Sequence, residues 1–415
     1  MPTQEELEVI SPQELKKYQE ERMRHILHYA YRHAPAVKDK LQRAGVGPED
    51  VKTLKDLEKV PITRKEDLVA LQKASPPFGG LCTRKVEELE RVLVSPGPIC
   101  EPLAPLEGGA LAMKAAGLGP GTVALLTPSF HMVPAGMLYD GSLRLNGATT
   151  VPTGPGNTEL QIQIMRQLKA NTYVGFPRFL MSIIQRAEEM GHNFRRDFSL
   201  KKAFLAGEMF PPSMCRRMRE DYGIDTWEHY GTADLGIVAY ECAQHDGLHL
   251  FPDIIVEVVD PKTGKQLGPG EAGELVVTNF HELYPMVRYG TGDASFYTDE
   301  ACPCGRKTRR LVDILGRVGD APRVRGLFLV PKEVLDVVSA FSQVTAFQLL
   351  VRMKGLRDEL LLRVEGPTVD KERLTKDMKD RFKDICRLDL DYVEFLPQGT
   401  IPQGAKVIVD ERKWE

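Results

Sequence analysis

The sequence predicts an α/β protein with a large N-terminal domain and a smaller α+β domain at the C-terminus. The chain has 415 residues, roughly two to three times the size of one usual domain, which predicts two domains. From about residue 122, short apolar runs alternate with helical stretches, the pattern of βαβ units in a parallel sheet. A mixture of strands and helices follows from about residue 318. We therefore place the domains at 1–317 and 318–415.

The first predicted element is a helix that begins after Ser11. Ser11 is followed by Pro12 at the first helical position and by Glu14 three residues after the cap, and an amphipathic run continues to about His33. This combination is a capping box with proline at the first position of a helix. Between about residues 36 and 90, short helical patterns alternate with Pro and Gly, which predicts a region of short elements.

The parallel sheet is predicted from four short apolar runs. They are VALLTP at 123–128, ATTVPT at 148–153, TYVGFP at 172–177 and KKAFLAGE at 201–208. Helical stretches at 159–170 and 178–191 separate them. The pattern then changes. Residues 253–280 read as two strands rich in β-branched residues around a Pro- and Gly-rich turn, which predicts a small antiparallel β unit.

The C-terminal segment predicts its own set of elements. A charged helix is expected from Lys371 to about Lys383, and the apolar segments at 330–342, 347–353, 360–366 and 391–396 read as a mixture of strands and helices. This mixture is typical of an α+β domain.

Composition excludes several classes of protein. The chain is 42% hydrophobic and 27% charged, with 55 Lys+Arg against 58 Asp+Glu, which is ordinary for a globular protein. A net charge of −3 gives no general attraction to nucleic acid or to an anionic membrane. The N-terminus is acidic and lacks a basic and then apolar leader, so we expect a cytoplasmic protein. The sequence leaves the oligomeric state open, a homodimer included.

Three cysteines and a histidine have the chemistry of a structural zinc site. Cys242 and His249 lie in ECAQHDGLHL, and Cys302 and Cys304 in EACPCGRK. Thiolates with one imidazole satisfy a tetrahedral zinc ion and leave no open position. His245 is a competing ligand, and four side chains that merely pack are the structural alternative.

Two glycine-containing turns carry polar groups suited to a nucleotide. In HYGTAD at 229–234, the Thr232 hydroxyl and the Asp234 carboxylate can hold a phosphate and a divalent ion. In RYGTGD at 288–293, Asp293 can accept the hydroxyls of a ribose. An ordinary strand-to-loop turn, and an aspartate bonded to its own backbone, are the structural interpretations. GRVGD at 316–320 is either a hinge or a solvated linker.

In order along the chain, these segments resemble the phenylacetate-CoA ligase family of the adenylate-forming superfamily. The resemblance covers nearly the whole chain. It is carried by residues 29–68, GATTVPTGPGNTELQI, AGEMFPPSM, EHYGTAD, ECAQHDGLHLFPD, DPKTGKQLGPGEAGELVVT, PMVRYGTGD, CPCGRK and ILGRVGDAPRVRG. It implies an AMP-forming acyl- or aryl-CoA ligase with a mobile C-terminal lid that rotates at about 318–320. A small carboxylic acid attacks ATP to form an acyl-adenylate, and CoA then displaces AMP. The implied cofactors are ATP/AMP, Mg²⁺, CoA and structural Zn²⁺.

The resemblance also implies roles for individual residues. In the nucleotide site these are Ser95 and Gly97 of the phosphate loop, Ala206, Gly207 and Glu208 beside adenine, Tyr230 stacking on adenine with Gly231 next to it, Thr232 at the α-phosphate, Asp234 at magnesium, Asp293 at ribose and Arg317 at the hinge. The acyl pocket is implied at Phe130, His131, Gly136, Phe176 and Pro177.

Two segments depart from the family pattern. The phosphate loop of the family is rich in Ser, Thr and Gly and ends in Lys-Pro, whereas VSPGPICEP at 94–102 has Pro98 within it and Glu101 at the lysine position. Proline removes an N–H donor. A carboxylate in place of an ammonium that faces triphosphate would cost about 2 kcal/mol even in bulk water. Near the C-terminus, an alignment with the family pattern that is anchored on Asp410 places Gly404 at the position of the catalytic lysine. Lys406 can take that role only if the alignment is shifted in register.

These departures keep other functions open. One is a catalytically impaired or repurposed relative that binds a nucleotide, an acyl-adenylate or an acyl group as a binding or regulatory module. Another is an acyl-transfer enzyme that uses a preformed adenylate or thioester and skips ATP.

Overall fold

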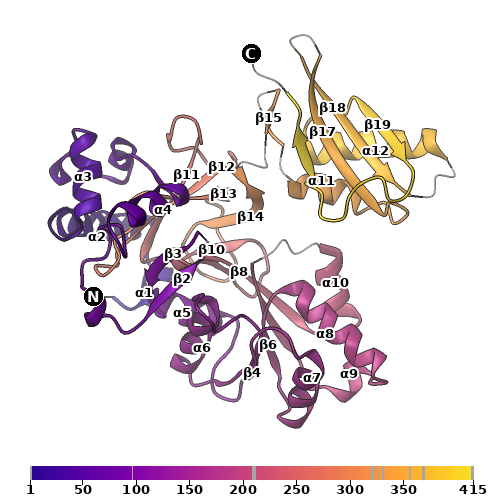
Figure 1. Cartoon of the computed structure of the whole chain (residues 1–415), viewed down its shortest axis with the longest axis horizontal. Coiled ribbons are helices and arrows are strands. Elements are labelled where there is room, and N and C mark those ends of the chain that lie inside the picture. Colours follow the sequence, from indigo (N-terminus) through magenta and orange to yellow (C-terminus); the bar gives the residue numbers. More distant parts are fainter. Residues whose placement is uncertain are drawn as a thin grey trace. The chain divides into compact units, whose positions relative to one another are not determined.

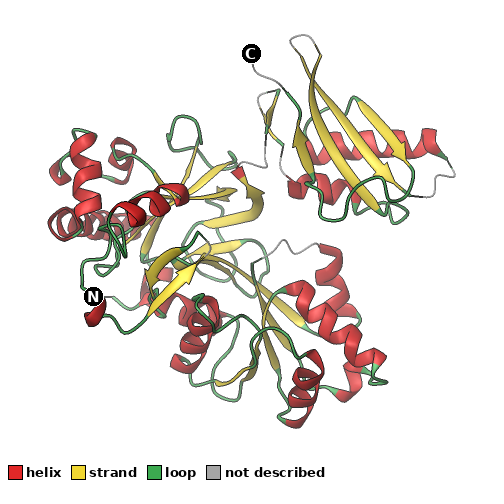
Figure 2. Cartoon of the chain, in the orientation of Figure 1, coloured by secondary structure: helices red, strands yellow, loops and turns green. Residues whose placement is uncertain are grey.

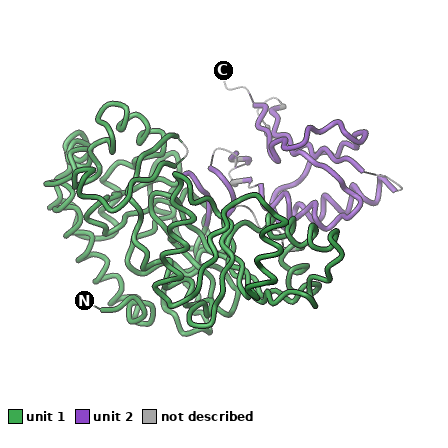
Figure 3. The backbone as a smooth tube through the Cα atoms, turned by 60° about the horizontal axis from the view of Figure 1, so that its bottom comes forward, with its two compact units in different colours: residues 1–291, 296–313 green, residues 292–295, 314–415 purple. Residues whose placement is uncertain are grey.

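The computed structural model describes residues 2–95, 97–207, 212–318, 322–325, 327–329, 331–354, 357–366 and 370–412. The chain forms two compact units (Figure 3). The first unit consists of residues 1–291 and 296–313, and the second of residues 292–295 and 314–415.

The first unit begins with helices. The predicted helix is confirmed as α2 (Pro12–His33), and the backbone N–H of Ser11 donates to the Glu14 carboxylate at 3.0 Å. The sequence analysis missed the short helix before it, α1 (Gln4–Val9), which has its own capping box from Thr3 and Glu6. The short elements that follow are α3 (Pro35–Arg43), 3-10 helices at Pro48–Asp50, Leu54–Lys59 and Val86–Glu88, β1 (Thr63–Arg64), α4 (Lys65–Ala74), β2 (Val92–Ser95) and β3 (Ile99–Pro102).

A parallel sheet follows, as predicted, and the α/β fold class is confirmed. Its strands are β4 (Val123–Leu126), β5 (Thr149–Pro152), β6 (Thr172–Gly175), β7 (Lys202–Leu205) and β8 (Asp225–Thr232), in the spatial order β5-β4-β6-β7-β8. The helices beside them are α5 (Glu107–Ala115), α6 (Ala135–Leu145), α7 (Thr158–Gln167), α8 (Pro177–Glu189), α9 (Phe194–Asp197) and α10 (Pro212–Glu220).

Helices cover both faces of this sheet (Figures 1 and 2). Strand β4 shows why, since successive side chains of a strand point to opposite faces. Leu125 packs with the core of α7 and α8. Its neighbours Ala124 and Leu126 pack with the core of α5 and α6. Strands buried on both faces are therefore continuously apolar, which is the pattern that predicted them.

The sheet continues beyond β8 with antiparallel strands. These are β9 (Gly236–Glu241), β10 (Leu248–Leu250), β11 (Ile254–Val259), β12 (Gly273–Asn279), β13 (Tyr289–Thr298) and β14 (Arg310–Arg317), in the spatial order β11-β12-β13-β14-β10-β9-β8. The predicted pair around 253–280 is β11 and β12, antiparallel, with Ile254 opposite Asn279. This pair extends the large sheet, because β12 is followed by β13 in the strand order.

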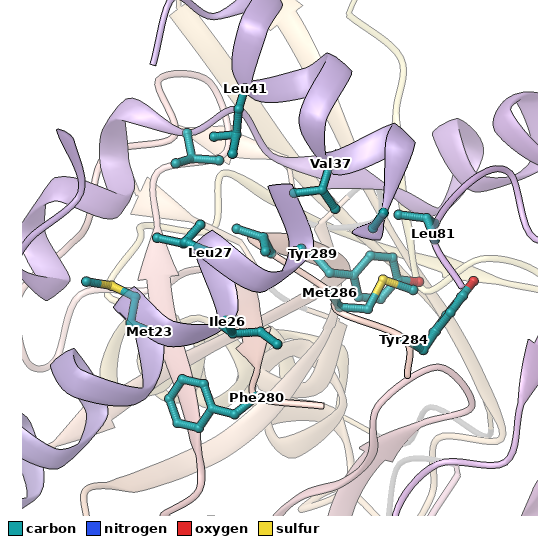
Figure 4. Close-up of a cluster of buried hydrophobic side chains, with 14 of the residues drawn as sticks. Met23, Ile26, Leu27, Val37, Leu41, Leu81, Phe280, Tyr284, Met286 and Tyr289 are labelled. Carbon is teal, nitrogen blue, oxygen red and sulfur yellow. The ribbon is translucent and has the colours of Figure 1, made fainter. Parts of the chain in front are cut away.

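The N-terminal helices cover the strands of this second region. Met23, Ile26 and Leu27 of α2 belong to one buried cluster with Tyr289 of β13 and Met286 just before it (Figure 4). The ring of Tyr289 is therefore packed within the hydrophobic core. Among the residues that the structure describes, no helix combines the length and apolar character needed to cross a bilayer.

The second unit contains the predicted α+β elements. They are β15 (Arg323–Val324), β16 (Leu327–Phe328), α11 (Pro331–Val338), β17 (Ala346–Lys354), β18 (Arg357–Glu365), α12 (Lys371–Cys386), β19 (Tyr392–Leu396) and β20 (Ile408–Asp410). The larger sheet has the order β19-β18-β17-β20. Alternate residues of β17 and β18, such as Leu349 and Leu362, pack against Val334 of α11 and Phe382 of α12. This unit thus has a core of its own.

Candidate active site

The turn between β8 and β9 presents the first group of predicted residues. A bulge between Tyr230 and Gly231 ends the regular pairing of the two strands. A Cβ on Gly231 would lie 2.4 Å from the carbonyl oxygen of Gly236, so only glycine fits there. In the turn, the Thr232 hydroxyl accepts a hydrogen bond from the backbone N–H of Leu235 at 3.3 Å. This bond leaves the hydroxyl hydrogen of Thr232 available to donate.

Asp234 lies in the same turn and is buried. Its Oδ2 accepts a hydrogen bond of 3.0 Å from the hydroxyl of Tyr289. Its Oδ1 has no hydrogen-bond partner within the described part of the chain. A buried carboxylate oxygen without a donor is a group that a hard cation satisfies. The residue therefore fits the magnesium role that the resemblance implies.

The predicted phosphate loop is a β-hairpin of β2 and β3. Leu93 pairs with Glu101, and Ser95 with Ile99. Gly97 is exposed at the turn, whereas the side chains of Ser95 and Glu101 are buried. The resemblance places Glu101 at the position of the lysine that faces a triphosphate. In the structure Glu101 is fully buried, because it lies on the strand and on the inward face of the hairpin.

Glu101 and Asp234 are neighbours in the first unit. Burial, and then the charge of Asp234, raises the pKa of Glu101 to about 9, against smaller opposing effects of Ser95 and Lys65. At neutral pH and without a ligand, Glu101 therefore holds a proton. The electrostatic penalty expected from a carboxylate at this position is correspondingly reduced.

The predicted adenine side and acyl pocket meet at one point. Gly207 has a φ of +84°, and a Cβ there would lie 2.4 Å from the ring of Phe176. Both the backbone angle and the ring require glycine. Ala206 donates its backbone N–H to the carbonyl of Gly175 at 3.3 Å. Glu208 lies outside the described residues.

Of the other predicted pocket residues, Gly136 lies against Phe130. A Cβ on Gly136 would lie 2.9 Å from the Phe130 ring, so these two residues are in close contact. Phe130 also lines a cavity of about 520 Å³ together with Leu103, Leu106 and Met137. His131 is exposed, and Pro177 is buried at the first position of α8.

Two predicted residues form an ion pair in the second unit. Arg317 donates to the Asp293 carboxylate at 2.9 Å, and the Arg317 side chain is about half exposed. Lys406, also in this unit, is exposed, and its carbonyl accepts a hydrogen bond of 3.1 Å from Gln348. Residues 319 and 320 of the predicted hinge lie outside the described residues.

The four predicted metal ligands converge in the first unit. Their ligand atoms all lie within 4.8 Å of one another. The sulfurs of Cys242 and Cys302 are 3.7 Å apart, and Cys304 Sγ is 3.4 Å from His249 Nε2. Tetrahedral zinc with bonds of about 2.3 Å to sulfur and about 2.0 Å to nitrogen requires separations of about 3.5–3.8 Å. The donor set and its spacing therefore fit zinc.

His249 is oriented for this role, whereas His245 is not. The Nδ1 atom of His249 lies 3.0 Å from the hydroxyl of Thr308, which leaves Nε2 toward the cysteines. Burial lowers the pKa of His249 to about 4, so its imidazole is neutral at neutral pH. His245 instead lies 3.1 Å from the Glu241 carboxylate and packs on Trp227, which excludes it from the cluster.

Two residues that support the site have no role that could be predicted from the sequence. Tyr289 and Arg288 stand within the RYGTGD segment, but spacing gave no sign of their partners. Arg288 is buried and forms two hydrogen bonds of 3.0 Å with the Glu257 carboxylate. This pair fixes the start of β13, and hence Tyr289, beneath Asp234.

Comparison with known proteins decides the family. The chain is 32% identical to the phenylacetate-coenzyme A ligase of Thermus thermophilus over 381 residues, which are 88% of this chain and 84% of that relative. This chain belongs to the phenylacetate-coenzyme A ligase family. The family member from Escherichia coli is 28% identical over 96% of this chain and 94% of its own length. Residues 109–281 also match the family described as AMP-binding enzyme.

Solved structures agree with this family assignment. An open conformation of 2-hydroxyisobutyryl-CoA ligase in complex with 2-HIB-AMP and CoA has a TM-score of 0.84 and is 26% identical, covering 98% of this chain and 93% of that chain. The same ligase in the postadenylation state with R3-HIB-AMP has a TM-score of 0.83 and is 25% identical, covering 98% and 92%. The fold of the phenylacetate-coenzyme A ligase family is thus that of adenylate-forming CoA ligases.

Proposed function

We propose that this chain is an AMP-forming acid-thiol ligase that activates a small carboxylic acid with ATP and transfers the acyl group to CoA. The observation that carries the proposal is the turn between β8 and β9. There Asp234 is held by Tyr289 and keeps one buried oxygen without a partner in the described structure, two residues from the free hydroxyl hydrogen of Thr232. The named activities of the curated relatives support it. The phenylacetate-coenzyme A ligases suggest an aryl acid as substrate, and the solved 2-hydroxyisobutyryl-CoA ligase suggests a short branched acid.

The residues of the turn have complementary roles in this proposal. The Thr232 hydroxyl donates to an oxygen of the α-phosphate while the acid attacks phosphorus and pyrophosphate leaves. Asp234 is the ligand that this turn offers to Mg²⁺, and the ion supplies positive charge to the phosphates when it is bound. Tyr289 keeps the Asp234 carboxylate in one orientation, because its ring is fixed in the core.

The remaining predicted roles rest on the resemblance. Asp293 is proposed to bind the ribose and Lys406 to stabilise charge at the α-phosphate. Residues 318–415 are proposed as the mobile lid. Phe130, Gly136 and Phe176 are proposed to surround the acyl group, since Gly136 and Gly207 leave room only for these rings.

Zinc is proposed as a structural ion at Cys242, His249, Cys302 and Cys304. Support comes from the spacing of the donor atoms and from the orientation of His249 by Thr308. Four protein ligands complete the tetrahedron, so the ion would stabilise the fold and leave no position for a substrate.

The test is ATP-dependent pyrophosphate release with a panel of aryl and short aliphatic acids, followed by detection of the CoA thioester. Calorimetric titration with AMP accompanies it. We expect Asp293→Ala to weaken AMP binding about tenfold or more, because it removes charge-assisted hydrogen bonds. Asp299→Ala is the matched control, since Asp299 is exposed and pairs with Arg309. If none of the acids in the panel caused release of pyrophosphate, the result would contradict the proposal.

A nucleotide-binding module without adenylation is the second candidate. The observation that favours it is the hairpin at 92–102, VLVSPGPICEP, which contains no Lys or Arg to hold a triphosphate. Binding of AMP without binding of Mg·ATP and without pyrophosphate release would favour this candidate over the ligase.

A further inference from the structure

Three side chains with oxygen donors gather beneath the hairpin of β2 and β3. Ser95 and Glu101 lie on the same face of the hairpin, because Ser95 pairs with Ile99 and Glu101 with Leu93. Asp234 comes from the turn between β8 and β9, and its charge acts on Glu101. The hairpin and the turn between β8 and β9, which are distant in sequence, therefore bring their polar groups to one buried point of the first unit.

Most oxygens of this group lack a regular hydrogen bond. In the portion of the chain that the structure describes, no hydrogen bond of regular geometry is made by the Glu101 carboxylate oxygens, by Oδ1 of Asp234 or by the Ser95 hydroxyl, although Glu101 is close enough to interact with Asp234 and Ser95. Glu101 is fully buried, and Ser95 and Asp234 are more than nine-tenths buried. Buried polar atoms are normally paired, so this concentration of unpaired oxygens indicates a missing ligand.

The chemistry of the group identifies the class of ligand. Without a ligand, the proton on Glu101 lets the two carboxyl groups be neighbours, whereas both can be ionised only with another positive species between them. Lys65 is the cation whose charge acts on Glu101, and it is half-buried and carries one charge. A divalent cation balances both carboxylates. Oxygen ligands without sulfur or nitrogen select a hard ion such as Mg²⁺ or Mn²⁺.

We propose that Glu101, Asp234 and Ser95 form a divalent-cation site that binds Mg²⁺ or Mn²⁺ before any nucleotide arrives. The inference deepens the proposed function and rests on it for the magnesium role of Asp234. Its new element is Glu101, a ligand at the position where the family pattern has a lysine. The bound cation would place positive charge beneath a hairpin that has no Lys or Arg of its own.

The experiment is a titration of nucleotide-stripped protein with Mn²⁺, followed by the electron paramagnetic resonance signal of free Mn²⁺. We expect one saturable Mn²⁺ per chain with a dissociation constant below about 1 mM. Glu101→Gln and Asp234→Asn should each weaken binding about tenfold or more, because each removes one of two anionic ligands. Glu188→Gln is the control, since Glu188 is exposed on α8.

Folding does not confound this test. Glutamine has the size of glutamate, and its amide can donate to Asp234, so Glu101→Gln should melt at or above the wild-type temperature. If that variant failed to fold, Glu101→Asp would replace it, because it keeps the charge but shortens the reach of the carboxylate to the cation. Binding of Mn²⁺ elsewhere on the protein would be unaffected by both substitutions, so equal affinity in wild type and Glu101→Gln would overturn the proposal.

Calorimetric titration with AMP on the same samples separates the two proposals. Wild-type protein that binds AMP and releases pyrophosphate, but takes no Mn²⁺ at about 1 mM without nucleotide, would overturn the cation site and leave the ligase standing. Protein that binds Mn²⁺ through Glu101, but never releases pyrophosphate, would overturn the ligase alone.

Discussion

The hydroxyl of Tyr289 donates a hydrogen bond of 3.0 Å to the Asp234 carboxylate and so joins β13 to the turn between β8 and β9. The Tyr289 ring belongs to a core cluster with residues of α2, and Arg288 before it is tied to Glu257 (Figure 4). The carboxylate is therefore oriented by a residue that cannot move independently of the core. This relationship makes Tyr289 a positioning residue for Asp234.

Replacement of Tyr289 by phenylalanine should remove this orientation. The substitution leaves a buried carboxylate oxygen without its donor, which should lower the free energy of unfolding by about 1–3 kcal/mol. Pyrophosphate release should fall about 10–100-fold, as expected when the partner of a metal ligand is removed. Urea unfolding and a Mg²⁺ titration of the rate would measure the two effects.

Tyr284→Phe is the matched control for this change. Tyr284 is buried in the same cluster, but within the described residues its hydroxyl makes no hydrogen bond to the Asp234 carboxylate. Its removal should therefore leave both stability and rate near the wild-type values. Equal effects of the two substitutions would contradict a specific role for Tyr289.

Loss of one cysteine from the metal cluster should lower zinc content and stability together. Cys302→Ser removes one of three thiolates, and a structural zinc site contributes its binding energy to folding. We expect less than one zinc per chain by elemental analysis and a lower melting temperature. Cys82→Ser makes the same chemical change at a half-buried thiol outside the cluster and should retain zinc. Metal-free wild-type protein that is as stable as the zinc-bound protein would contradict the zinc assignment.

Gly207→Ala should perturb the acyl pocket. Alanine at a φ of +84° costs about 1–2 kcal/mol, and its Cβ would also lie 2.4 Å from the Phe176 ring. We expect a raised KM for the acid in addition to a lower melting temperature. Gly154→Ala separates the two causes, because Gly154 has a φ of +66° but open space around it. The same rise in KM for both variants would contradict the contact with Phe176.

Acid should destabilise the protein through His229. This residue is buried, stacks on Phe204 and lies 2.9 Å from the Tyr139 hydroxyl. Burial lowers the pKa of His229 from 6.5 to about 3. At a pH between these two pKa values, the unfolded chain binds a proton at His229 and the folded protein does not, so the stability falls as the pH falls. From pH 7 to pH 5 this residue should account for a loss of about 2 kcal/mol.

Urea unfolding at both pH values would measure this loss. Glutamine in His229→Gln does not titrate and can still form a hydrogen bond with Tyr139. Between pH 7 and pH 5 the free energy of unfolding of this variant should therefore fall by about 2 kcal/mol less than that of the wild type. His28 is exposed on α2, and His28→Gln should keep the wild-type dependence. A wild-type dependence in His229→Gln as well would show that other groups cause the effect.

Sequence patterns predicted much of the fold because they depend on near neighbours. The capping box at Ser11, the apolar run at 123–126 and the helix that begins at Lys371 all appear where periodicity and capping placed them. Helix α1 was missed despite its capping box of Thr3 and Glu6, because six residues are too few to show a helical period. The zinc ligands could be named from residue type, but the choice of His249 over His245 needed their positions.

The sequence by itself determined the α/β class, the family resemblance and the cysteines proposed to bind zinc, since these depend on residue type and local order. The tertiary structure alone decided that Glu101 is buried beside Asp234 and that Tyr289 holds this carboxylate. The physical reason is that periodicity reports the face of one strand or helix, whereas the charge and bonding of a side chain depend on residues that packing brings from distant segments.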